Sequence, residues 1–335
     1  MRFESWVIAI VQHGQTVHLS LLQYCEGLYL DSNINIMNQI KSIIATTTIA
    51  ACMLACQSPK TTDETSAQDT VETVQKAPLT LNLKWETDTV LTTCESVLYD
   101  QERDLLYVSN INGQPDGKDG NGFISKVNLD GKVIELEWVK GLNAPKGLGQ
   151  YKDKLYVADI DRVLEVDVSN GKITKSFAVD DAKFLNDITV DSTGRIYISD
   201  TGAGNIMLIE NGKLTKWMEN IDAPNGLLAE GNKLQMLTWS GQTVNTIDVP
   251  SKQVTMRIDS IENLDGIEAM ADAGYILSSW NGLIHYVDED WNNTMVLDLR
   301  ADSVNSADIE YIEARKLLLV PTFFKNSVRA YEVSR

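Results

Sequence analysis

The chain contains little cysteine and histidine, the residue types that most often build zinc sites and nucleophilic dyads. Its 335 residues include four cysteines and three histidines, of which only Cys94 and His285 follow residue 56. One cysteine excludes an intramolecular disulfide in that part of the chain. One histidine without a partner at ligand spacing supports neither a zinc site nor a Ser-His-Asp or Cys-His arrangement. We interpret Cys94 as a small packing residue and His285 as a structural or surface residue, so packing alone must stabilise the fold.

Basic residues are also scarce. The chain has 47 Asp and Glu against 29 Lys and Arg, a formal net charge of −18. Without residues 1–56 the balance is 44 against 27, or −17. A surface this acidic argues against nucleic acid and anionic lipid as partners. The acidic residues are spread along the chain rather than gathered in a tail, and we interpret them as a solubility feature.

A hydrophobic run long enough to span a membrane is missing as well. Residues 43–55 are apolar but shorter than the roughly 20 residues that a spanning helix needs. They follow the short basic segment 37–41, a pattern typical of a secretory signal peptide. Near its end, Cys52 and Cys56 each follow small and apolar residues, as in the bacterial lipoprotein box. We favour Cys56 as the lipidation site because a polar tract begins directly after it; an ordinary secretory signal with bystander cysteines is the alternative.

These features predict four segments. Residues 1–36 show no clear period and are interpreted as an unstructured or non-native extension before the signal peptide, 37–56. Residues 57–79 are rich in Ser, Thr, Gln and acidic side chains, which predicts a flexible polar linker. Residues 80–335 form the folded domain. We expect a protein held in the bacterial cell envelope, on the periplasmic or outer-membrane side, by an N-terminal lipid anchor.

A pair of short strands recurs along the folded domain. Its clearest copy, 184–200, is a strand, an Asp-x-x-Gly turn and a second strand, with apolar and polar residues alternating in both strands. Six copies begin with Glu95-Ser96, Lys146-Gly147, Asn186-Asp187, Asn225-Gly226, Asp265-Gly266 and Ala307-Asp308. A period of about 40 residues with four strands per unit predicts an all-β, six-bladed β-propeller with four-stranded antiparallel blades.

Two departures from this period carry further predictions. The first step is longer than the others because residues 112–122 are inserted after a second strand, so they overhang the end of the ring where that strand finishes. We favour a flexible lid or a plain surface loop there; a calcium loop, indicated by its Asp and Gly content, is the alternative, although the spacing and closing Glu of an EF-hand are missing. Alternating runs at 81–85 and 327–333 lie outside the six copies. We expect the first of these to complete the last blade as its outer strand and so close the ring without a covalent bond.

The residues that open each copy carry the chemistry. Ring closure brings Glu95, Lys146, Asn186, Asn225, Asp265 and Ala307 around one axis, and the pair Asn186-Asp187 is expected on the same rim as Asp200 at the end of the second strand. Two carboxylates and two amides supply oxygen ligands, which suit a hard cation such as Ca²⁺ and disfavour zinc. The pattern therefore predicts a divalent metal site on the axis.

At these positions the chain resembles a known family. Glu95 and the stretches 186–195, 224–227 and 264–267 are similar to motifs of the senescence-marker-protein/gluconolactonase/luciferin-regenerating-enzyme family, over roughly residues 88–335. The resemblance implies a six-bladed propeller with one axial divalent metal held by Glu95, Asn225 and Asp265. Related phosphotriesterase-type propellers use a further Asn, matched here by Asn186.

The chain departs from that family at one substrate position. Sugar-lactone hydrolases of the family carry an Arg where this chain has Phe184, and the neighbouring Lys183 is a point charge rather than a guanidinium fork. The ends of the second strands are expected to place three aromatic and three polar residues on the rim: Trp239, Trp280, Phe323, Asn110, Asp159 and Asp200. The aromatic members indicate a substrate with an apolar or planar part.

Two functions from different classes follow. The first is a monomeric, Ca²⁺-dependent hydrolase of a lactone or related ester, in which Asp265 is the catalytic base or water-orienting group and Glu95, Asn186, Asn225 and Asp265 hold the metal. Its small-molecule substrate would contact Lys146, Asn186, Asp187, Trp239 and Trp280. The second is a non-catalytic ligand-binding or scaffold propeller, because function belongs to the site rather than to the propeller.

Overall fold

The computed structural model describes residues 8–13, 16–21 and 77–335. The chain divides into two units, Met1–Thr73 and Val74–Arg335. The signal peptide, both candidate lipidation cysteines and most of the linker lie outside the described residues. No helix in the described part of the chain is long and apolar enough to cross a membrane.

The first unit contains one described hairpin. Strands β1 (Ile8–His13) and β2 (Thr16–Leu21) pair antiparallel, with Ile8 opposite Leu21. This departs from the expectation of an unstructured extension at these residues. The reason lies in the sequence of 16–21, where Val17, Leu19 and Leu21 alternate with polar residues over a stretch too short to show a clear period.

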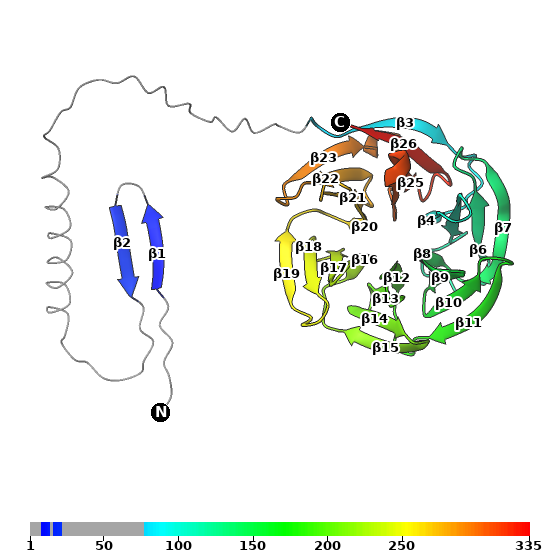
Figure 1. Cartoon of the computed structure of the whole chain (residues 1–335), viewed down its shortest axis with the longest axis horizontal. Coiled ribbons are helices and arrows are strands. Elements are labelled where there is room, and N and C mark those ends of the chain that lie inside the picture. Colours follow the sequence, from blue (N-terminus) through cyan, green and yellow to red (C-terminus); the bar gives the residue numbers. More distant parts are fainter. Residues whose placement is uncertain (1–7, 14–15, 22–76) are drawn as a thin grey trace, which may run out of the picture. The chain divides into compact units, whose positions relative to one another are not determined.

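The second unit is the predicted six-bladed propeller with four antiparallel strands per blade (Figure 1). In each blade the strands run from the inner, axial strand to the outer one. Blade 1 is β4 (Cys94–Asp100), β5 (Leu105–Asn110), β6 (Gly122–Val127) and β7 (Val133–Leu142). Blade 2 is β8 (Pro145–Tyr151), β9 (Lys154–Asp159), β10 (Arg162–Asp167) and β11 (Lys172–Ala178). Blade 3 is β12 (Leu185–Val190), β13 (Ile196–Asp200), β14 (Asn205–Glu210) and β15 (Lys213–Met218).

The remaining blades complete the ring. Blade 4 is β16 (Pro224–Glu230), β17 (Lys233–Thr238), β18 (Val244–Asp248) and β19 (Val254–Ile258). Blade 5 is β20 (Leu264–Ala269), β21 (Tyr275–Ser279), β22 (Leu283–Val287) and β23 (Asn293–Asp298). Blade 6 is β24 (Glu310–Ile312), β25 (Leu317–Pro321), β26 (Val328–Ser334) and β3 (Thr80–Glu86). Two 3₁₀ turns, η1 (Arg300–Asp302) and η2 (Glu313–Arg315), lie in blades 5 and 6.

The ring closes as predicted. Strand β3, from the start of the domain, pairs antiparallel with β26 from its end, so that Thr80 lies opposite Ser334. The Glu86 carboxylate accepts a hydrogen bond from the Ser327 hydroxyl at 2.6 Å and pairs with the Arg329 guanidinium at 3.1 Å. Because β3 supplies the outer strand of blade 6, the two ends of the domain hold each other without a covalent bond.

Buried apolar side chains fill the spaces between neighbouring blades. The cluster between blades 6 and 1, for example, contains Leu106, Val108 and Leu319. Cys94 belongs to the same cluster, which confirms it as a packing residue. Its thiol donates to the Ser327 carbonyl at 3.0 Å, and burial raises the pKa of Cys94 to about 12. The thiol is therefore inert at neutral pH.

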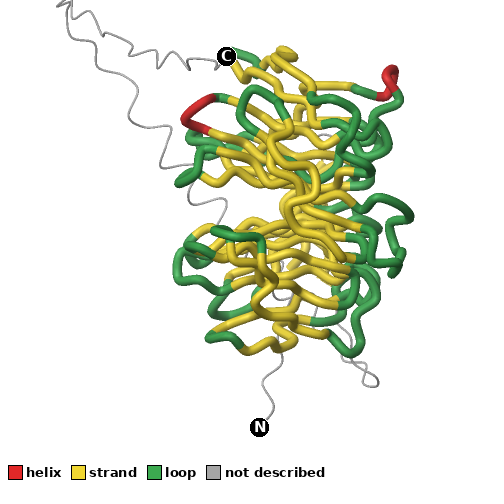
Figure 2. The backbone as a smooth tube through the Cα atoms, turned by 90° about the vertical axis from the view of Figure 1, so that its right-hand side faces the viewer, coloured by secondary structure: helices red, strands yellow, loops and turns green. Residues whose placement is uncertain are grey.

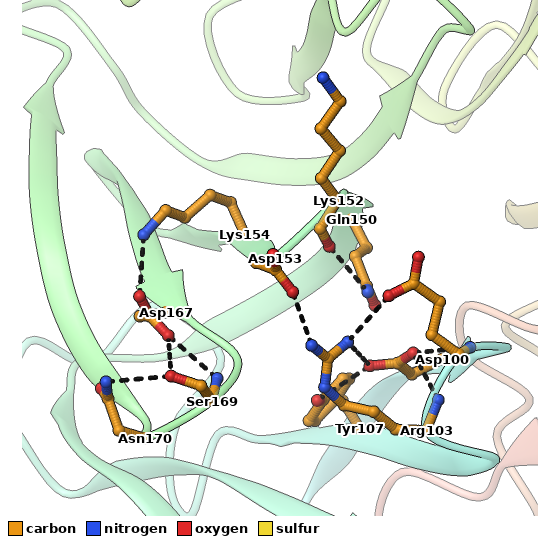
Figure 3. Close-up of polar contacts among 11 residues, drawn as sticks. Asp100, Arg103, Tyr107, Gln150, Lys152, Asp153, Lys154, Asp167, Ser169 and Asn170 are labelled. Atoms are coloured by element: carbon orange, nitrogen blue, oxygen red, sulfur yellow. Dashed lines mark hydrogen bonds and ion pairs between the residues drawn. The ribbon is translucent and has the colours of Figure 1, made fainter.

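Polar contacts also join neighbouring blades at the turns (Figure 3). The Arg103 guanidinium contacts Asp100 of its own blade at 3.1 Å and Asp153 of blade 2 at 2.6 Å. The Tyr107 hydroxyl donates to the same Asp100 carboxylate.

Seen from the side, strands form the body of the ring and the loops gather on its two faces (Figure 2). One of those faces carries the candidate site.

Candidate functional site at the mouth of the central channel

A bulge in the inner strand of each of blades 1 to 5 positions the site residues. The register with the second strand shifts between Cys94 and Val97 in β4, and at the equivalent place in β8, β12, β16 and β20. The two skipped residues in each strand are the predicted site pairs, such as Asp265-Gly266. Bulges re-aim side chains and are frequent beside active sites. Here they turn the first residue of each pair out of the sheet toward the axis.

Glycine after the site residue lets the inner strands approach one another. A Cβ on Gly226 would lie 2.0 Å from the Asp265 carbonyl oxygen, and one on Gly266 would lie 2.6 Å from the Ile309 amide nitrogen. The Asn-Gly and Asp-Gly pairs, which as dipeptides are ordinary turn signals, therefore sit inside strands. Their glycines serve close backbone contact around the axis.

The first residues of the pairs meet at a pocket of about 670 Å³. It is lined by Glu95, Pro115, Asp116, Lys146, Lys183, Phe184, Asn186, Thr201, Gly202, Trp239, Asp265, Trp280 and Phe323. The predicted set is thus largely brought together: Glu95, Lys146, Asn186, Asp265, Trp239 and Trp280 all line one cavity. The pocket has a polar floor and aromatic walls, which is the usual composition of small-molecule sites.

A chain of hydrogen bonds joins the floor residues of blades 3, 4 and 5. The Asn186 amide donates to Asn225 Oδ1 at 2.6 Å, and the Asn225 amide donates to Asp265 Oδ1 at 3.0 Å. Asn225 also donates to the Leu264 carbonyl at 2.9 Å. Asn225 is buried behind the pocket surface, so it fixes the orientation of its two neighbours.

Glu95 enters the same floor from blade 1. Its side chain is 5% exposed, and Oε2 has no hydrogen-bond partner among the described residues. Burial raises the pKa of Glu95 well above its usual range; the charge of Lys146 opposes this shift, and the charges of Asp265 and Asp187 add to it. A buried carboxylate oxygen without a partner is costly. A cation or a donor on a ligand would satisfy it.

Lys146 is the basic group of the floor. It is 1% exposed, and its ammonium lies 4.5 Å from the centre of the Phe184 ring. Burial lowers the pKa of Lys146, while the charges of Glu95, Asp265, Asp159 and Asp116 act in the opposite direction. The surrounding carboxylates and the face of the ring stabilise the ammonium without filling all three of its donor positions.

Asp265 titrates close to neutrality in this environment. Burial raises the pKa of Asp265 to about 7; the hydrogen bond from Asn225 and the charge of Lys146 oppose this, and the charge of Asp187 adds to it. A carboxyl group with a pKa near the working pH can hold or release a proton there.

The floor residues carry oxygen donors, the ligand type that a hard cation takes. Glu95, Asn186 and Asp265 line one pocket, Asn225 lies behind it with Oδ1 accepting from Asn186, and Glu95 Oε2 has no hydrogen-bond partner among the described residues. Among the described residues, no group of three or more His, Cys, Asp or Glu side chains is arranged to hold a metal. The candidate set contains only two carboxylates and is completed by Asn186 and Asn225, so its fit depends on the amide oxygens and on the unsatisfied Glu95.

Asp187 does not join the pocket. Its carboxylate accepts hydrogen bonds from the amides of Ile188 and Leu227, both at 2.6 Å, and it lines a second cavity of about 180 Å³ together with Glu268, Asp308 and Glu310. The expectation that Asn186 and Asp187 share one rim is therefore wrong, because successive side chains of a strand point in different directions even across a bulge. We no longer assign Asp187 to substrate binding.

The polar residues expected on the rim form hydrogen bonds with backbone groups instead. The Asp200 carboxylate accepts from the amides of Lys183, Phe184 and Ala203. Asp159 likewise accepts from two amides of the loop that enters blade 2, and Asn110 donates to a carbonyl of its own strand. All three side chains are buried; Asp159 and Asp200 fix the loops that lead into the inner strands of blades 2 and 3, whereas Asn110 bonds within blade 1.

The sequence analysis missed several lining residues. Phe184 was noted only as the replacement of an Arg, yet its ring covers Lys146. Pro115 and Asp116 come from the inserted segment 112–122, which confirms that this segment overhangs the pocket. An ion pair of 2.7 Å between Lys118 and Asp161 ties the segment to blade 2. The insertion itself was the one sequence signal for these contacts.

Comparison with known proteins adds information on the fold. No protein-family model matches the chain, and no curated protein matches its sequence. Among solved structures, it is similar to a catalytically inactive histidine-to-alanine variant of virginiamycin B lyase from Staphylococcus aureus with quinupristin, at 13% identity and a TM-score of 0.55 over 76% of this chain and 99% of that one. A streptogramin B lyase is 13% identical with a TM-score of 0.55, and the match covers 77% of this chain and 98% of that one. Selenomethionine-substituted virginiamycin B lyase from S. aureus is 14% identical with a TM-score of 0.53, and the match covers 76% of this chain and 99% of that one. Similarity at this level supports the six-bladed propeller and does not single out the family whose motifs the chain resembles.

Proposed function

We propose that the chain is a divalent-cation-dependent hydrolase of a lactone or related ester with an apolar part, acting at the mouth of the central channel. The observation that carries this proposal is the buried, unpartnered Oε2 of Glu95, a residue that lines the same pocket as Asp265 and Lys146. A floor that combines an unpartnered carboxyl oxygen, a carboxyl group titrating near neutrality and a buried ammonium suits the polarisation of a carbonyl and the handling of a proton.

Glu95, Asn186, Asn225 and Asp265 would hold the cation, with Ca²⁺ favoured because every donor is an oxygen. When bound, such an ion acts as a Lewis acid toward a carbonyl oxygen and can lower the barrier by several kcal/mol. The side chains of the floor have separate roles. Asp265 orients the attacking water and takes its proton, and Lys146 donates to an oxygen of the substrate. The Asn225 amide keeps Asp265 in place.

The apolar part of the substrate would lie against Trp239 and Trp280, whose ring centres are 6.0 Å apart. Phe184 stands where the sugar-lactone hydrolases of the resembled family carry an Arg, so this pocket lacks a fork of donors for sugar hydroxyls. We therefore place sugar lactones below apolar lactones and esters as substrates.

The names of the similar structures raise the lyase reaction as an alternative. In one of them, replacement of a histidine accompanies loss of catalysis. In the described residues 77–335, the one histidine is His285, on β22. It is 7% exposed, bonded to Asn293 at 3.1 Å and absent from the pocket lining. A histidine-dependent reaction therefore finds no support in this site.

One observation favours a non-catalytic binding propeller as the second candidate. Asn186, Asn225 and Asp265 already satisfy one another by hydrogen bonds, so most of the floor is stable without an ion. In either case we propose that the chain is a monomer anchored in the bacterial cell envelope through Cys56, which lies outside the described residues.

A substrate panel separates the two candidates. Aryl esters, aliphatic lactones, sugar lactones and phosphotriesters would be assayed with the full chain, first with Ca²⁺ and then with a chelator. We expect hydrolysis of an apolar ester or lactone that the chelator abolishes. Activity that ignores the chelator contradicts the metal-dependent mechanism, and the absence of activity on every member favours the binding propeller.

A further inference from the structure

Aromatic side chains occupy equivalent positions in three consecutive blades. The position is that of the residue that follows the second strand, directly or by one place. In blades 1 to 3 this residue is Ile111, Ile160 or Thr201, and in blades 4 to 6 it is Trp239, Trp280 or Phe323. The aliphatic residues Ile111 and Ile160 are buried in an apolar cluster with Phe323. At this position blades 4 to 6 supply aromatic rings to the pocket and blades 1 to 3 do not.

These rings form a continuous edge-to-face wall that reaches the outer surface. Ring centres are 6.0 Å apart between Trp239 and Trp280 and 5.8 Å apart between Trp280 and Phe323. Phe324 extends the wall, 4.7 Å from Phe323 and 6.1 Å from Trp280. Phe324 is 55% exposed, so a large apolar ring is held in water at the end of the wall. Phe324 contacts two rings that line the pocket, so its exposed ring extends the surface available to a bound ligand.

The backbone that presents this wall is strained. Phe323 has φ of 48°, a conformation rarely adopted by a bulky residue. Neighbouring contacts hold it there: Phe323 bridges to Cys94 of blade 1, and the Asn326 side chain accepts from the Thr93 amide at 2.8 Å. Strain of this kind persists where the surroundings impose it. Here it places one ring in the pocket and the next ring outside it.

From this geometry we infer that the substrate carries an aromatic ring system, bound along the wall of Trp239, Trp280, Phe323 and Phe324 while its carbonyl group lies on the floor. The inference rests on the proposed function and names its substrate class. Flat rings gain edge-to-face contact with such a wall beyond the burial of apolar area. A saturated group of the same size gains only the burial. Successive rings of the wall lie 4.7 to 6.0 Å apart over four residues, which matches a ring system larger than one benzene ring.

Two ketones that cannot be hydrolysed test this inference by binding alone. Naphthyl methyl ketone and decahydronaphthyl methyl ketone have the same carbon skeleton, and only the first is aromatic. Isothermal titration calorimetry of the full chain should show the naphthyl ketone binding about 3- to 10-fold more tightly than the saturated one. Phe324→Ala should weaken the naphthyl ketone by a similar factor and leave the saturated ketone within about twofold.

Met256→Ala is the matched control, since Met256 is 59% exposed on the outer strand β19 and is not a pocket residue. It should change neither affinity. Equal affinity for the two ketones, or full affinity for the naphthyl ketone in Phe324→Ala, would overturn the inference. Selective ketone binding without hydrolysis of any ester would remove the proposed function and keep the aromatic site. Hydrolysis of an ester without any preference for the naphthyl ketone would keep the proposed function and remove the aromatic site.

Discussion

Asp265 and Asp187 are both buried carboxylates near the axis, and their partners assign them different roles. Asp265 accepts one hydrogen bond from the Asn225 side chain and lines the pocket. Asp187 accepts from two backbone amides, those of Ile188 and Leu227. A carboxylate that serves the backbone contributes to stability, whereas one with a free oxygen beside a pocket is available for chemistry. The pair provides a matched test within one molecule.

Asp265→Asn should abolish most activity and preserve the fold. The amide has the same size and keeps one ligand oxygen, but it cannot carry the negative charge or take a proton. We expect kcat/KM for an apolar ester to fall on the order of 10²- to 10⁴-fold, the usual contribution of a general base. Melting temperature, followed by circular dichroism, should be unchanged or higher, because a buried carboxylate next to other acids is removed.

Asp187→Asn is the control and should show the opposite behaviour. The amide group offers one carbonyl oxygen where two oxygens accept backbone amides, so one buried amide loses its partner. Unfolding in urea should show a loss of about 1–3 kcal/mol, with kcat/KM within about threefold of the unchanged chain once folded. If Asp187→Asn lost activity and Asp265→Asn kept it, the assignment of Asp265 to catalysis and of Asp187 to stability would be wrong.

At the scale of elements, the bulged inner strands determine the site. The bulge exposes the first residue of each pair to the axis, and the following glycine lets the neighbouring inner strand pass close by. Gly226 is the tightest of these contacts, with the Asp265 carbonyl oxygen only 2.0 Å from the position of an added Cβ. The neighbouring strand must move if any side chain is placed there.

Gly226→Ala should therefore both destabilise the fold and distort the site. We expect a loss of about 3 kcal/mol in urea unfolding, as for an overpacked core position, and a large drop in turnover because the displaced atoms belong to Asp265. Gly113→Ala, in the inserted segment, is the control. Its added Cβ would meet nothing nearer than 3.6 Å, so a change within about 0.5 kcal/mol is expected. Equal stability of the two variants would contradict the close packing of blades 4 and 5.

The same elements show how far the sequence predicts the structure. Alternating apolar residues and the repeat period were sufficient for the blades, for the closing role of β3 and for the convergence of Glu95, Asn186 and Asp265. A bulge leaves no pattern of its own, so the direction of Asp187 could not be read from alternation. The role of Asp200 was also hidden, since its partners are backbone amides that are present at every residue. Phe184 lines the pocket through a loop whose course depends on Asp200.

At the scale of the molecule, buried carboxyl groups line both the pocket and the second cavity. Beyond the pocket, burial raises the pKa of Glu310 to about 7. Burial and neighbouring carboxylates raise the pKa of Glu268 and Asp308 well above their usual range. Unfolded carboxyl groups titrate near pH 4. Between these values the folded chain binds protons that the unfolded chain has released.

Stability should consequently fall as the pH rises through neutrality. A raised folded-state pKa contributes stability that is present at low pH and lost as the group ionises in the fold. With a chelator present, the melting temperature should be higher at about pH 6 than at about pH 8, and Glu310→Gln should reduce the difference. A melting temperature that is constant or rises over this interval would show that these groups ionise without cost.

The central claim is that one divalent cation on the axis supports hydrolysis at this pocket. The most direct test follows the hydrolysis rate of an apolar ester by the chelator-treated full chain while Ca²⁺ is added back, with the bound ion counted in the same samples. The account predicts a rate near zero without the ion, and saturable recovery as one ion per chain binds. A rate that is undiminished by the chelator, or that recovers without a stoichiometric bound ion, would contradict it.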